Sequence, residues 1–586
     1  KTSFLFSHER DMADLSVEVV STQPIAGQKT GTSGLRKRVK EFQSPNYLNN
    51  WIQSLFNSLE GLKGSTLVLG GDGRFWNDEA IQIILNMSAA AGVSKVLVGQ
   101  NGILSTPAVS AIIRERKIFG GIILTASHNP GGPDNDFGIK YNCSNGGPAP
   151  ESITADIFKY TESISEYRIV SLPKIDLSAL GEKTFDVKDV GTFAVEIIDS
   201  VADYLNVLKR VFDFAALKSF LQREDFKLLF DAMHGVTGPY ATRIIVEELG
   251  APAESVVHSV PLPDFGGGHP DPNLTYAPEL VKLVLEDENS KYDFGAASDG
   301  DGDRNMVIGR NFFVTPSDSL ALIAENAKDA IPYFSNGLKV VARSMPTSAA
   351  CDHLKKTLGT ELYEVPTGWK FFGNIMDHYE KEGGKAVICG EESFGTSSDH
   401  VREKDGLWAV LAWISILAYK NRESKKGELV SVATIVKDYW SRHGRNFYCR
   451  YDYEGVESEA AANLMKHLQD SQSDLSPEGF LQGVAKKHGY TFSTADVFDY
   501  SDPFDKSVSK NQGLRFLFSD GSRVVFRLSG TGSVGATIRM YLEQYQNDKE
   551  KLGGSGQDGL ADLVKCAVEF SKMKEFTGRD SPTVIT

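Results

Sequence analysis

Short apolar runs alternate with stretches of helical spacing along most of the chain. Residues 66–70 and 95–98 predict strands, and residues 79–91 between them place their apolar side chains on one helical face. The alternation returns with predicted strands at 121–124, 227–230, 338–342 and 386–389, and a predicted helix at 241–249. Strands separated by helices predict α/β domains with mixed sheets, in which helices cover parallel strand pairs.

Beyond Asp438 the pattern changes. It predicts a helix over 458–470 and strands over 497–500, 514–518 and 522–528. This grouping indicates a separate α+β domain. We therefore expect α/β domains at 1–205, 206–316 and 317–437 and an α+β domain at 438–586, with a hinge near Asp438.

Composition narrows the class of protein. The 586 residues are 41% hydrophobic and 24% charged, which excludes global disorder. The net charge of −15 leaves no basic footprint for nucleic acid or an anionic membrane. The five cysteines are far apart, which argues against a zinc ribbon or disulfide scaffold and favours a reducing compartment.

The longest apolar stretch, 407–419, is too short to span a bilayer and predicts a buried helix. We expect a cytoplasmic protein without membrane insertion.

Three apolar runs end in loops of small and polar residues, at 124–127, 294–299 and 388–392. Ligands of open α/β sheets gather beyond the carboxyl ends of strands. We therefore expect three related domains that share one cleft.

The first of these loops is Thr-Ala-Ser-His-Asn-Pro-Gly-Gly over 125–132. A serine on a tight turn after a strand exposes its hydroxyl and directs backbone N–H groups at an anion. Ser127 is thus a candidate nucleophile or phosphate carrier. An ordinary Asx-type turn is the alternative.

The second loop alternates glycine with Asp299, Asp301 and Asp303. Converging carboxylates repel one another unless a cation neutralises them, and all-oxygen ligands suit Mg²⁺. An EF-hand is excluded because Arg304 and Arg310 stand where glycine and glutamate are needed. A solvated acidic turn is the alternative.

The third loop, Gly-Glu-Glu-Ser-Phe-Gly over 390–395, offers Glu391 and Ser393 to sugar hydroxyls. A helix N-cap at Ser393 is the alternative.

A fourth motif, over 527–539, contains the glycine spacing of a dinucleotide fingerprint. That fingerprint must open a helix, whereas residues 538–542 alternate as a strand does. A phosphate cradle built from Ser529, Thr531 and Ser533, flanked by Arg527 and Arg539, fits better. A flexible glycine turn is the alternative.

Two smaller motifs accompany these four. Residues 31–38 offer hydroxyls and cations, with a solvated basic patch as the alternative. Residues 367–372 form a glycine-hinged aromatic loop, for which simple packing is the alternative.

On these motifs the chain resembles the eukaryotic phosphoglucomutases of the α-D-phosphohexomutase superfamily, parafusin-like forms included. The resemblance runs from the motif at 31–36 to Arg539. It implies a heart-shaped arrangement of three similar α/β domains and a C-terminal domain of TATA-binding-protein-like fold. It also implies interconversion of glucose 1-phosphate and glucose 6-phosphate through a phosphoserine and glucose 1,6-bisphosphate.

The resemblance also assigns roles to residues. Ser127 would carry the phosphate and, with Asp299, Asp301 and Asp303, hold one Mg²⁺; His128 and Lys404 are the proton-transfer candidates and Arg304 lines the cleft. The substrate-binding set would be Thr32, Arg36, Lys140, Thr367, Gly368, Trp369, Glu391, Ser393, Arg527, Ser529, Gly530, Thr531, Ser533 and Arg539.

Two rival functions remain open. One is a related phosphosugar enzyme: a glucose 1,6-bisphosphate synthase, or a mutase of pentose or mannose phosphates. The other is a non-catalytic scaffold paralogue. We expect a phosphosugar as the small-molecule partner and a monomer as the assembly, with a dimer as the alternative.

Overall fold

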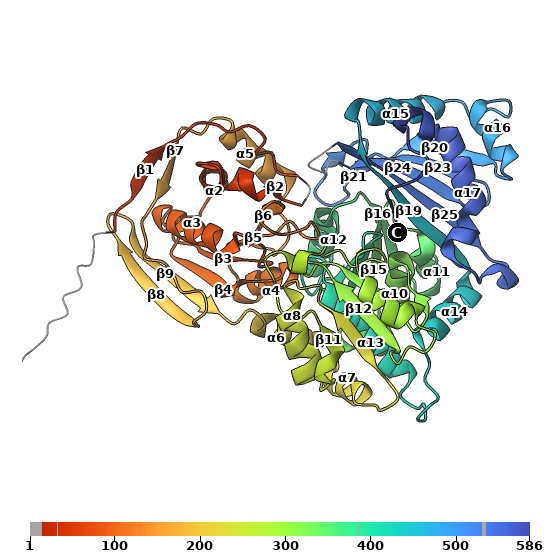
Figure 1. Cartoon of the computed structure of the whole chain (residues 1–586), viewed down its shortest axis with the longest axis horizontal. Helices are drawn as coiled ribbons and strands as arrows, with labels where there is room; N and C mark the ends of the chain where they lie inside the picture. The colour runs from red at the N-terminus through yellow and green to blue at the C-terminus, as the bar shows by residue number, and fades with distance from the viewer. Residues whose placement is uncertain (1–14, 32, 385, 530–534) are drawn as a thin grey trace, which may run out of the picture.

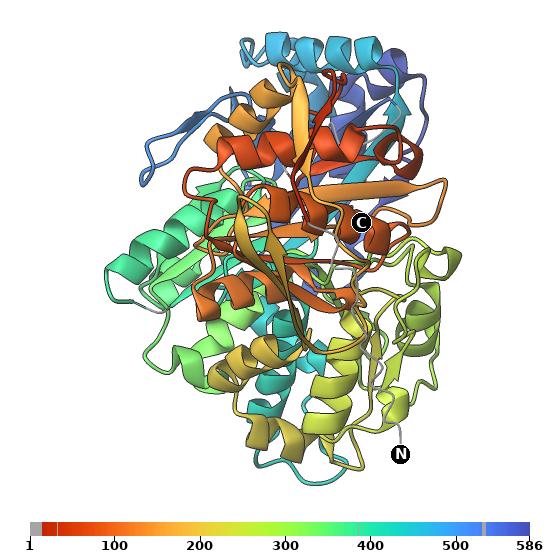
Figure 2. The same ribbon diagram turned by 90° about the vertical axis from the view of Figure 1, so that its left-hand side faces the viewer.

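The computed structural model describes residues 15–31, 33–384, 386–529 and 535–586. Its ribbon has a heart-shaped outline, in which the N-terminal and C-terminal units form the two upper lobes (Figure 1). The turned view places the C-terminal unit at the top and the second unit at the bottom (Figure 2). Three units contain mixed sheets and the last contains an antiparallel sheet, which confirms the predicted fold class.

The first unit is built on a seven-stranded sheet in the order β2-β6-β5-β3-β4-β9-β8. Strands β5, β3, β4 and β9 run parallel, and the outer strands are antiparallel to their neighbours. The strands are β2 (Leu35–Arg38), β3 (Thr66–Gly71), β4 (Lys95–Ile103), β5 (Gly120–Leu124), β6 (Asp136–Asn142), β8 (Gly181–Val187) and β9 (Gly191–Ile198). The predicted strands at 66–70, 95–98 and 121–124 are thus confirmed.

Helices and one small ribbon complete this unit. The helices are α1 (Val39–Phe42), α2 (Tyr47–Ser58), α3 (Asn77–Ala90), α4 (Thr106–Arg116) and α5 (Glu151–Thr161). Strands β1 (Glu18–Ser21) and β7 (Glu166–Ile169) pair apart from the main sheet. Helix α3 confirms the prediction over 79–91.

The second unit has a five-stranded sheet in the order β11-β10-β12-β13-β14. Its strands are β10 (Leu228–Asp231), β11 (Val256–Val257), β12 (Phe294–Ser298), β13 (Asn305–Gly309) and β14 (Phe312–Phe313). Its helices are α6 (Ala202–Val211), α7 (Phe214–Leu221), α8 (Thr237–Ala241) and α9 (Pro278–Leu280), with π-helical turns at Thr242–Glu248 and Val281–Glu286. The predicted helix over 241–249 is therefore mostly π-helical.

The third unit repeats the plan with the order β16-β15-β17-β18. Its strands are β15 (Val340–Ser344), β16 (Glu361–Val365), β17 (Val387–Glu391) and β18 (Gly395–Ser398). Its helices are α10 (Pro316–Ala330), α11 (Leu354–Thr357), α12 (Trp369–Lys381), α13 (Gly406–Lys420) and α14 (Val432–His443).

The two middle units share one apolar core around α13. Residues 406–417 of this helix are buried, as predicted for the apolar stretch at 407–419. The helix packs against α10 and β18 of its own unit and against α7 and β13 of the second. Separate core clusters fill the first and last units.

The last unit has an antiparallel sheet in the order β20-β23-β24-β25-β19-β26. Its strands are β19 (Arg445–Val456), β20 (Phe492–Val497), β23 (Leu514–Phe518), β24 (Arg523–Ser529), β25 (Ala536–Gln546) and β26 (Val584–Ile585). Its helices are α15 (Ser458–Ser471), α16 (Phe480–Lys487), α17 (Gly556–Ser571) and α18 (Met573–Thr577).

Two predictions about this part of the chain need correction. The strand expected over 497–500 is wrong: β20 ends at Val497, the ring of Phe498 turns inward against Val525 and Tyr541, and pairing resumes in a hairpin of β21 (Tyr500–Ser501) and β22 (Val508–Ser509). The hinge expected near Asp438 falls inside α14. The first backbone break comes later, at Gly444 with φ 82°.

One topological feature recurs in every unit. Each polar loop joins a strand to its antiparallel neighbour: β5 to β6, β12 to β13, β17 to β18, and β24 to β25. The first three candidate loops therefore occupy equivalent positions, each after a strand that pairs in parallel on its other side, whereas β24 and β25 belong to a wholly antiparallel sheet. No helix in the described part of the chain is long and apolar enough to cross a membrane, and all five cysteines are free thiols.

Candidate active site

A cavity of about 230 Å³ lies where loops from all four units meet. Among the predicted site residues, those that line it are Arg36, Ser127, His128, Lys140, Asp303, Arg304, Thr367, Gly368, Trp369, Glu391, Ser393, Lys404, Arg527, Ser529 and Arg539. Asp299 and Asp301 are buried and adjoin this lining through contacts with Ser127 and Lys140. The predicted residues Thr32, Gly530, Thr531 and Ser533 lie outside the described residues.

Ser127 begins the turn after β5 in a left-handed conformation, with φ 53°. Its side chain is directed at the second unit: Oγ donates to Asp299 Oδ2 at 3.0 Å and lies 3.3 Å from His128 Nδ1. Only 2% of its surface is exposed. The hydroxyl thus sits between a carboxylate and an imidazole, which is the environment expected of a reactive serine.

Asp299, Asp301 and Asp303 follow β12, and their carboxylate oxygens lie within 4.8 Å of one another. Gly302, at φ 81°, permits the tight turn that brings them together. Lysines from the first and third units approach this group: Lys140 Nζ lies 3.3 Å from Asp301, and Lys404 Nζ lies 3.2 Å from Asp303. The loop that carries the three aspartates is therefore buried and contacts positively charged side chains of two other units.

The protonation of these carboxylates reflects that crowding. Burial and the charges of Asp303 and Asp301 raise the pKa of Asp299 well above its ordinary value. Burial acts in the same direction on Asp301, but Lys140 and the Thr106 hydroxyl outweigh it and lower the pKa of that group. One proton or one cation would relieve the repulsion.

The residues present fit a hard divalent cation. Asp301 Oδ1 is buried and has no hydrogen-bond partner, so it retains a free lone pair beside the other carboxylates. Carboxylate oxygens are the ligands that Mg²⁺ prefers, and Ser127 Oγ adjoins the group. The solvated acidic turn is excluded because all three aspartates are buried.

His128 of the first unit and Lys404 of the third unit both line the cavity. Burial and the nearby cations Arg304 and Arg36 lower the pKa of His128 well below 6.5, so its imidazole is neutral at pH 7. Lys404 reaches Asp303 across Gly395, where a Cβ atom would lie 2.3 Å from the Lys404 side chain. Gly395 therefore provides the space through which Lys404 enters the site.

The third unit supplies the groups suited to sugar hydroxyls. Glu391 is buried, accepts from the Gly368 N–H at 2.9 Å, and has a pKa raised by burial. Ser393 lies in the turn between β17 and β18, so the helix N-cap alternative is wrong. Buried polar atoms of Thr367 and Trp369 have no partner. Polar groups left unpaired at a cavity wall are suited to ligand hydroxyls.

The last unit supplies two arginines. Arg527 in β24 and Arg539 in β25 are directly opposed in the sheet register. Residues 536–546 form a strand rather than a helix. The structure therefore agrees with the sequence in excluding a dinucleotide-binding fingerprint here. Two guanidinium groups side by side at a cavity suit a phosphate.

Sequence reasoning missed several residues near this site. Glu403 lines the cavity, and burial raises its pKa to about 7. Asp72 and Arg74 form a buried ion pair directly behind Ser127. Their signal was present, because Gly-Asp-Gly-Arg over 71–74 follows a predicted strand as the other polar loops do.

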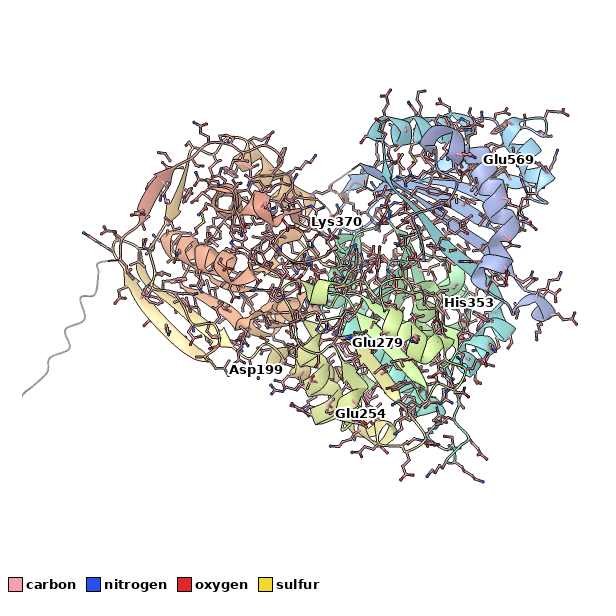
Figure 3. The ribbon with its side chains drawn as sticks, in the orientation of Figure 1. Asp199, Glu254, Glu279, His353, Lys370 and Glu569 are labelled. Atoms are coloured by element: carbon pink, nitrogen blue, oxygen red, sulfur yellow. The ribbon has the colours of Figure 1, made fainter. Side chains whose placement is uncertain are left out.

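A second group of possible metal ligands lies elsewhere in the described structure. It consists of Glu325, His353 and His443, with His353 on the flank of the third unit (Figure 3). Arg442 already occupies both oxygens of Glu325, and the two imidazole rings stack face to face at 4.0 Å. Their lone pairs therefore do not converge on one point, and we assign this group no metal.

Models of known protein families match nearly the whole chain. Phosphoglucomutase/phosphomannomutase alpha/beta/alpha domains I, II and III match residues 27–168, 202–311 and 315–442. The phosphoglucomutase-1 C-terminal domain matches residues 445–583.

Individual relatives agree with this result. The chain is 60% identical to phosphoglucomutase 1, chloroplastic, of Marchantia polymorpha, covering 97% of this chain and 84% of that protein. It is 58% identical to a probable cytoplasmic phosphoglucomutase of Arabidopsis thaliana, covering 98% and 100%. The open form of the exocytosis-sensitive phosphoprotein parafusin, a phosphoglucomutase from Paramecium, is 49% identical with a TM-score of 0.88, covering 98% and 100%.

Proposed function

The chain belongs to the phosphoglucomutase/phosphomannomutase family, and on that basis we propose that it is a phosphoglucomutase. It interconverts glucose 1-phosphate and glucose 6-phosphate, as an intramolecular phosphotransferase of the isomerase class. The observation that carries this proposal is the contact of 3.0 Å between Ser127 Oγ and Asp299, in a cavity that also holds Arg527 and Arg539. Relatives of 55–60% identity are named phosphoglucomutases.

Ser127 is the proposed phosphate carrier. In the forward direction, the C6 oxygen of glucose 1-phosphate forms a bond to phosphorus while the bond from phosphorus to Ser127 Oγ breaks. The product is glucose 1,6-bisphosphate, which reverses its orientation in the cavity. Ser127 Oγ then accepts the phosphoryl group from C1, and glucose 6-phosphate remains.

Asp299, Asp301, Asp303 and the phosphate on Ser127 would hold one Mg²⁺, which would supply positive charge to the group in transfer. Lys140 and Arg304 add cationic side chains beside it. His128 is our first candidate base for the C6 hydroxyl because its lowered pKa keeps it neutral. Lys404, which pairs with Asp303, is the candidate proton donor to the departing oxygen.

The two ends of the substrate are proposed to bind in different units. Glu391 and Ser393 hold sugar hydroxyls, and Thr367, Gly368 and Trp369 distinguish the two orientations. Arg527, Ser529 and Arg539 bind the phosphate that does not react, together with Gly530, Thr531 and Ser533. Arg36 lines the same cavity from the first unit, and we assign Thr32 to the same substrate-binding set. The direct opposition of Arg527 and Arg539 supports this assignment.

The test is conversion of glucose 1-phosphate to glucose 6-phosphate with Mg²⁺ and a trace of glucose 1,6-bisphosphate. We expect turnover by the parent, collapse in Ser127→Ala, and unchanged turnover in Ser88→Ala, which removes a buried hydroxyl bonded only within α3. Equal activity of the parent and Ser127→Ala would exclude a phosphoserine at position 127 from the mechanism. An inactive, folded and phosphorylated parent would favour the scaffold alternative, and faster turnover of mannose or pentose phosphates would favour a related mutase.

The cellular setting is also a proposal. Relatives named as cytoplasmic support a cytosolic enzyme, although chloroplastic relatives match as well. We propose that a monomer suffices, because all four walls of the cavity come from one chain. Cell fractionation and light scattering test these two points.

A further inference from the structure

We propose that the buried pair of Asp72 and Arg74, acting through Thr125, positions Ser127 for phosphoryl transfer. This inference rests on the proposed function, because it assigns a role to residues that never touch the substrate. Asp72 and Arg74 are positioning residues in this scheme, and Ser127 remains the group that reacts.

The pair lies directly behind the serine loop. Both residues follow β3, which pairs with β5, the strand that leads to Ser127. Arg74 Nε lies 3.0 and 2.9 Å from the two oxygens of Asp72, and neither side chain has any exposed surface. No part of this pair lines the cavity. Its contacts are therefore with the loop and not with a ligand.

Arg74 holds the carbonyl of Ser127 directly, and Asp72 holds the Ser127 N–H through Thr125. Arg74 Nη2 donates to the Ser127 carbonyl at 3.0 Å. On the other side, the Ser127 N–H donates to Thr125 Oγ1 at 2.7 Å, and that hydroxyl donates to Asp72 Oδ2 at 2.6 Å. The hydrogen bonds thus form a closed ring that runs from the serine N–H through Thr125, Asp72 and Arg74 to the serine carbonyl.

Arg74 also fixes the far end of the loop. Its Nη1 donates to the carbonyl of Asp136, the first residue of β6, at 2.8 Å. One guanidinium therefore bridges the serine and the strand to which the loop returns. Its planar arrangement of donors suits this double contact, which a lysine could not reproduce.

The backbone of Ser127 needs such restraint. Its φ of 53° is disfavoured for a residue with a Cβ atom. Rotation of the flanking peptides toward a more common conformation would redirect Oγ away from Asp299. Gly300 packs so closely on the Ser127 carbonyl that a Cβ atom there would lie 2.7 Å from its oxygen. The ring and Gly300 therefore both restrain the backbone of Ser127.

A purely stabilising role explains the pair less well. A buried ion pair is often no more stabilising than apolar residues of the same volume, because both charges lose their hydration. The ring instead has the geometry expected of groups that fix a reacting atom, where an error of about 1 Å costs about 100-fold in rate.

Thr125→Val removes the bridging hydroxyl but keeps the shape of the side chain. Thr125→Ser retains the hydroxyl. The matched control is Thr161→Val, because Thr161 is also a buried threonine of the first unit and its hydroxyl bonds only to Phe158 O. The measurements are kcat and KM, the rate at which glucose 1,6-bisphosphate phosphorylates Ser127, and amide hydrogen exchange of the segment that contains Ser127.

We expect Thr125→Val to lower kcat and the phosphorylation rate about 100-fold with KM within about threefold. Exchange at the serine loop should rise. Thr125→Ser should recover most of the rate, and Thr161→Val should keep the parent kcat. If Thr125→Val does not fold, Arg74→Lys decides the question with the same measurements.

The idea is overturned if Thr125→Val keeps the parent kcat, or if Thr125→Ser is as slow as Thr125→Val. If the parent is inactive but Thr125→Val still increases hydrogen exchange at the serine loop, the proposed function is contradicted. The conclusion that Thr125 restrains the loop would still hold. Failure of the positioning role and failure of the proposed function would therefore give different results.

Discussion

Arg527 and Arg539 stand directly opposite each other on β24 and β25. Opposed like charges on one face of a sheet are destabilising. Asp452, opposite Arg539 on the next strand, lies 3.6 Å from Arg539 Nε, whereas Arg527 donates to the Gln512 carbonyl and approaches the hydroxyl of Tyr541. A bound phosphate would offset the repulsion that remains.

The first prediction concerns this arginine pair. Inorganic phosphate should raise the Tm of the parent, and Arg527→Met or Arg539→Met should abolish most of that increase. Loss of one charged hydrogen bond of about 1.5–3 kcal/mol should raise the KM for glucose 1-phosphate about 10- to 100-fold. The control is Arg168→Met, an exposed arginine on β7. An unchanged phosphate response in both variants would contradict the assignment.

The second prediction concerns metal removal. Chelation should abolish turnover, and Mg²⁺ should raise the Tm of the parent because it offsets the repulsion among Asp299, Asp301 and Asp303. Asp301→Asn should lose the Mg²⁺-dependent increase in Tm, as measured by calorimetry with and without the ion. Asp470→Asn, at an exposed aspartate of α15, should keep it. A full response in Asp301→Asn would place the ion elsewhere.

The third prediction concerns Gly395. A Cβ atom there would lie 2.3 Å from Lys404 Cδ, so Gly395→Ala must displace the lysine. We expect kcat to fall at least tenfold and the free energy of unfolding to fall by about 1–3 kcal/mol. Gly483→Ala is the control: this position in α16 is open, and alanine should stabilise the helix by up to about 1 kcal/mol. Steady-state kinetics and denaturant unfolding measure both effects, and a normal kcat in Gly395→Ala would show that Lys404 is dispensable.

The fourth prediction concerns His353. Burial and the neighbouring His443 lower the pKa of His353 from 6.5 to about 4. Between these two values the unfolded chain binds a proton that the folded chain does not. Stability from this group is therefore complete above pH 6.5 and decreases as the pH falls toward 4. His353→Gln should reduce the difference in Tm between pH 7.5 and pH 5. The same difference in both proteins would argue against a lowered pKa.

Much of the candidate active site could be predicted from short segments of sequence. The alternation of aspartate and glycine after a strand predicts a carboxylate cluster, because neighbouring residues on a tight turn must lie close together. Likewise, the uninterrupted apolar run around Trp408 and Trp413 predicts a helix buried on all sides, as α13 is. These inferences depend on spacing of a few residues, which the chain geometry itself enforces.

The boundaries and hinges were less predictable. Phe498 leaves its strand because its ring packs against Val525 and Tyr541, which lie on other strands. Position 438 lies within α14 because that helix packs on the shared core of the middle units. In both cases tertiary packing overrode the local pattern.

By itself, the sequence determined which chemical groups follow which strands and that four such groups exist. Only the tertiary structure decided that Ser127 meets Asp299, that Lys140 and Lys404 reach the same carboxylates, and that Asp72 and Arg74 hold the serine from behind. These partners are far apart in the chain. The pairing of strands that are distant in the sequence and the packing of the units bring them together, and the periodicity of a local segment specifies neither.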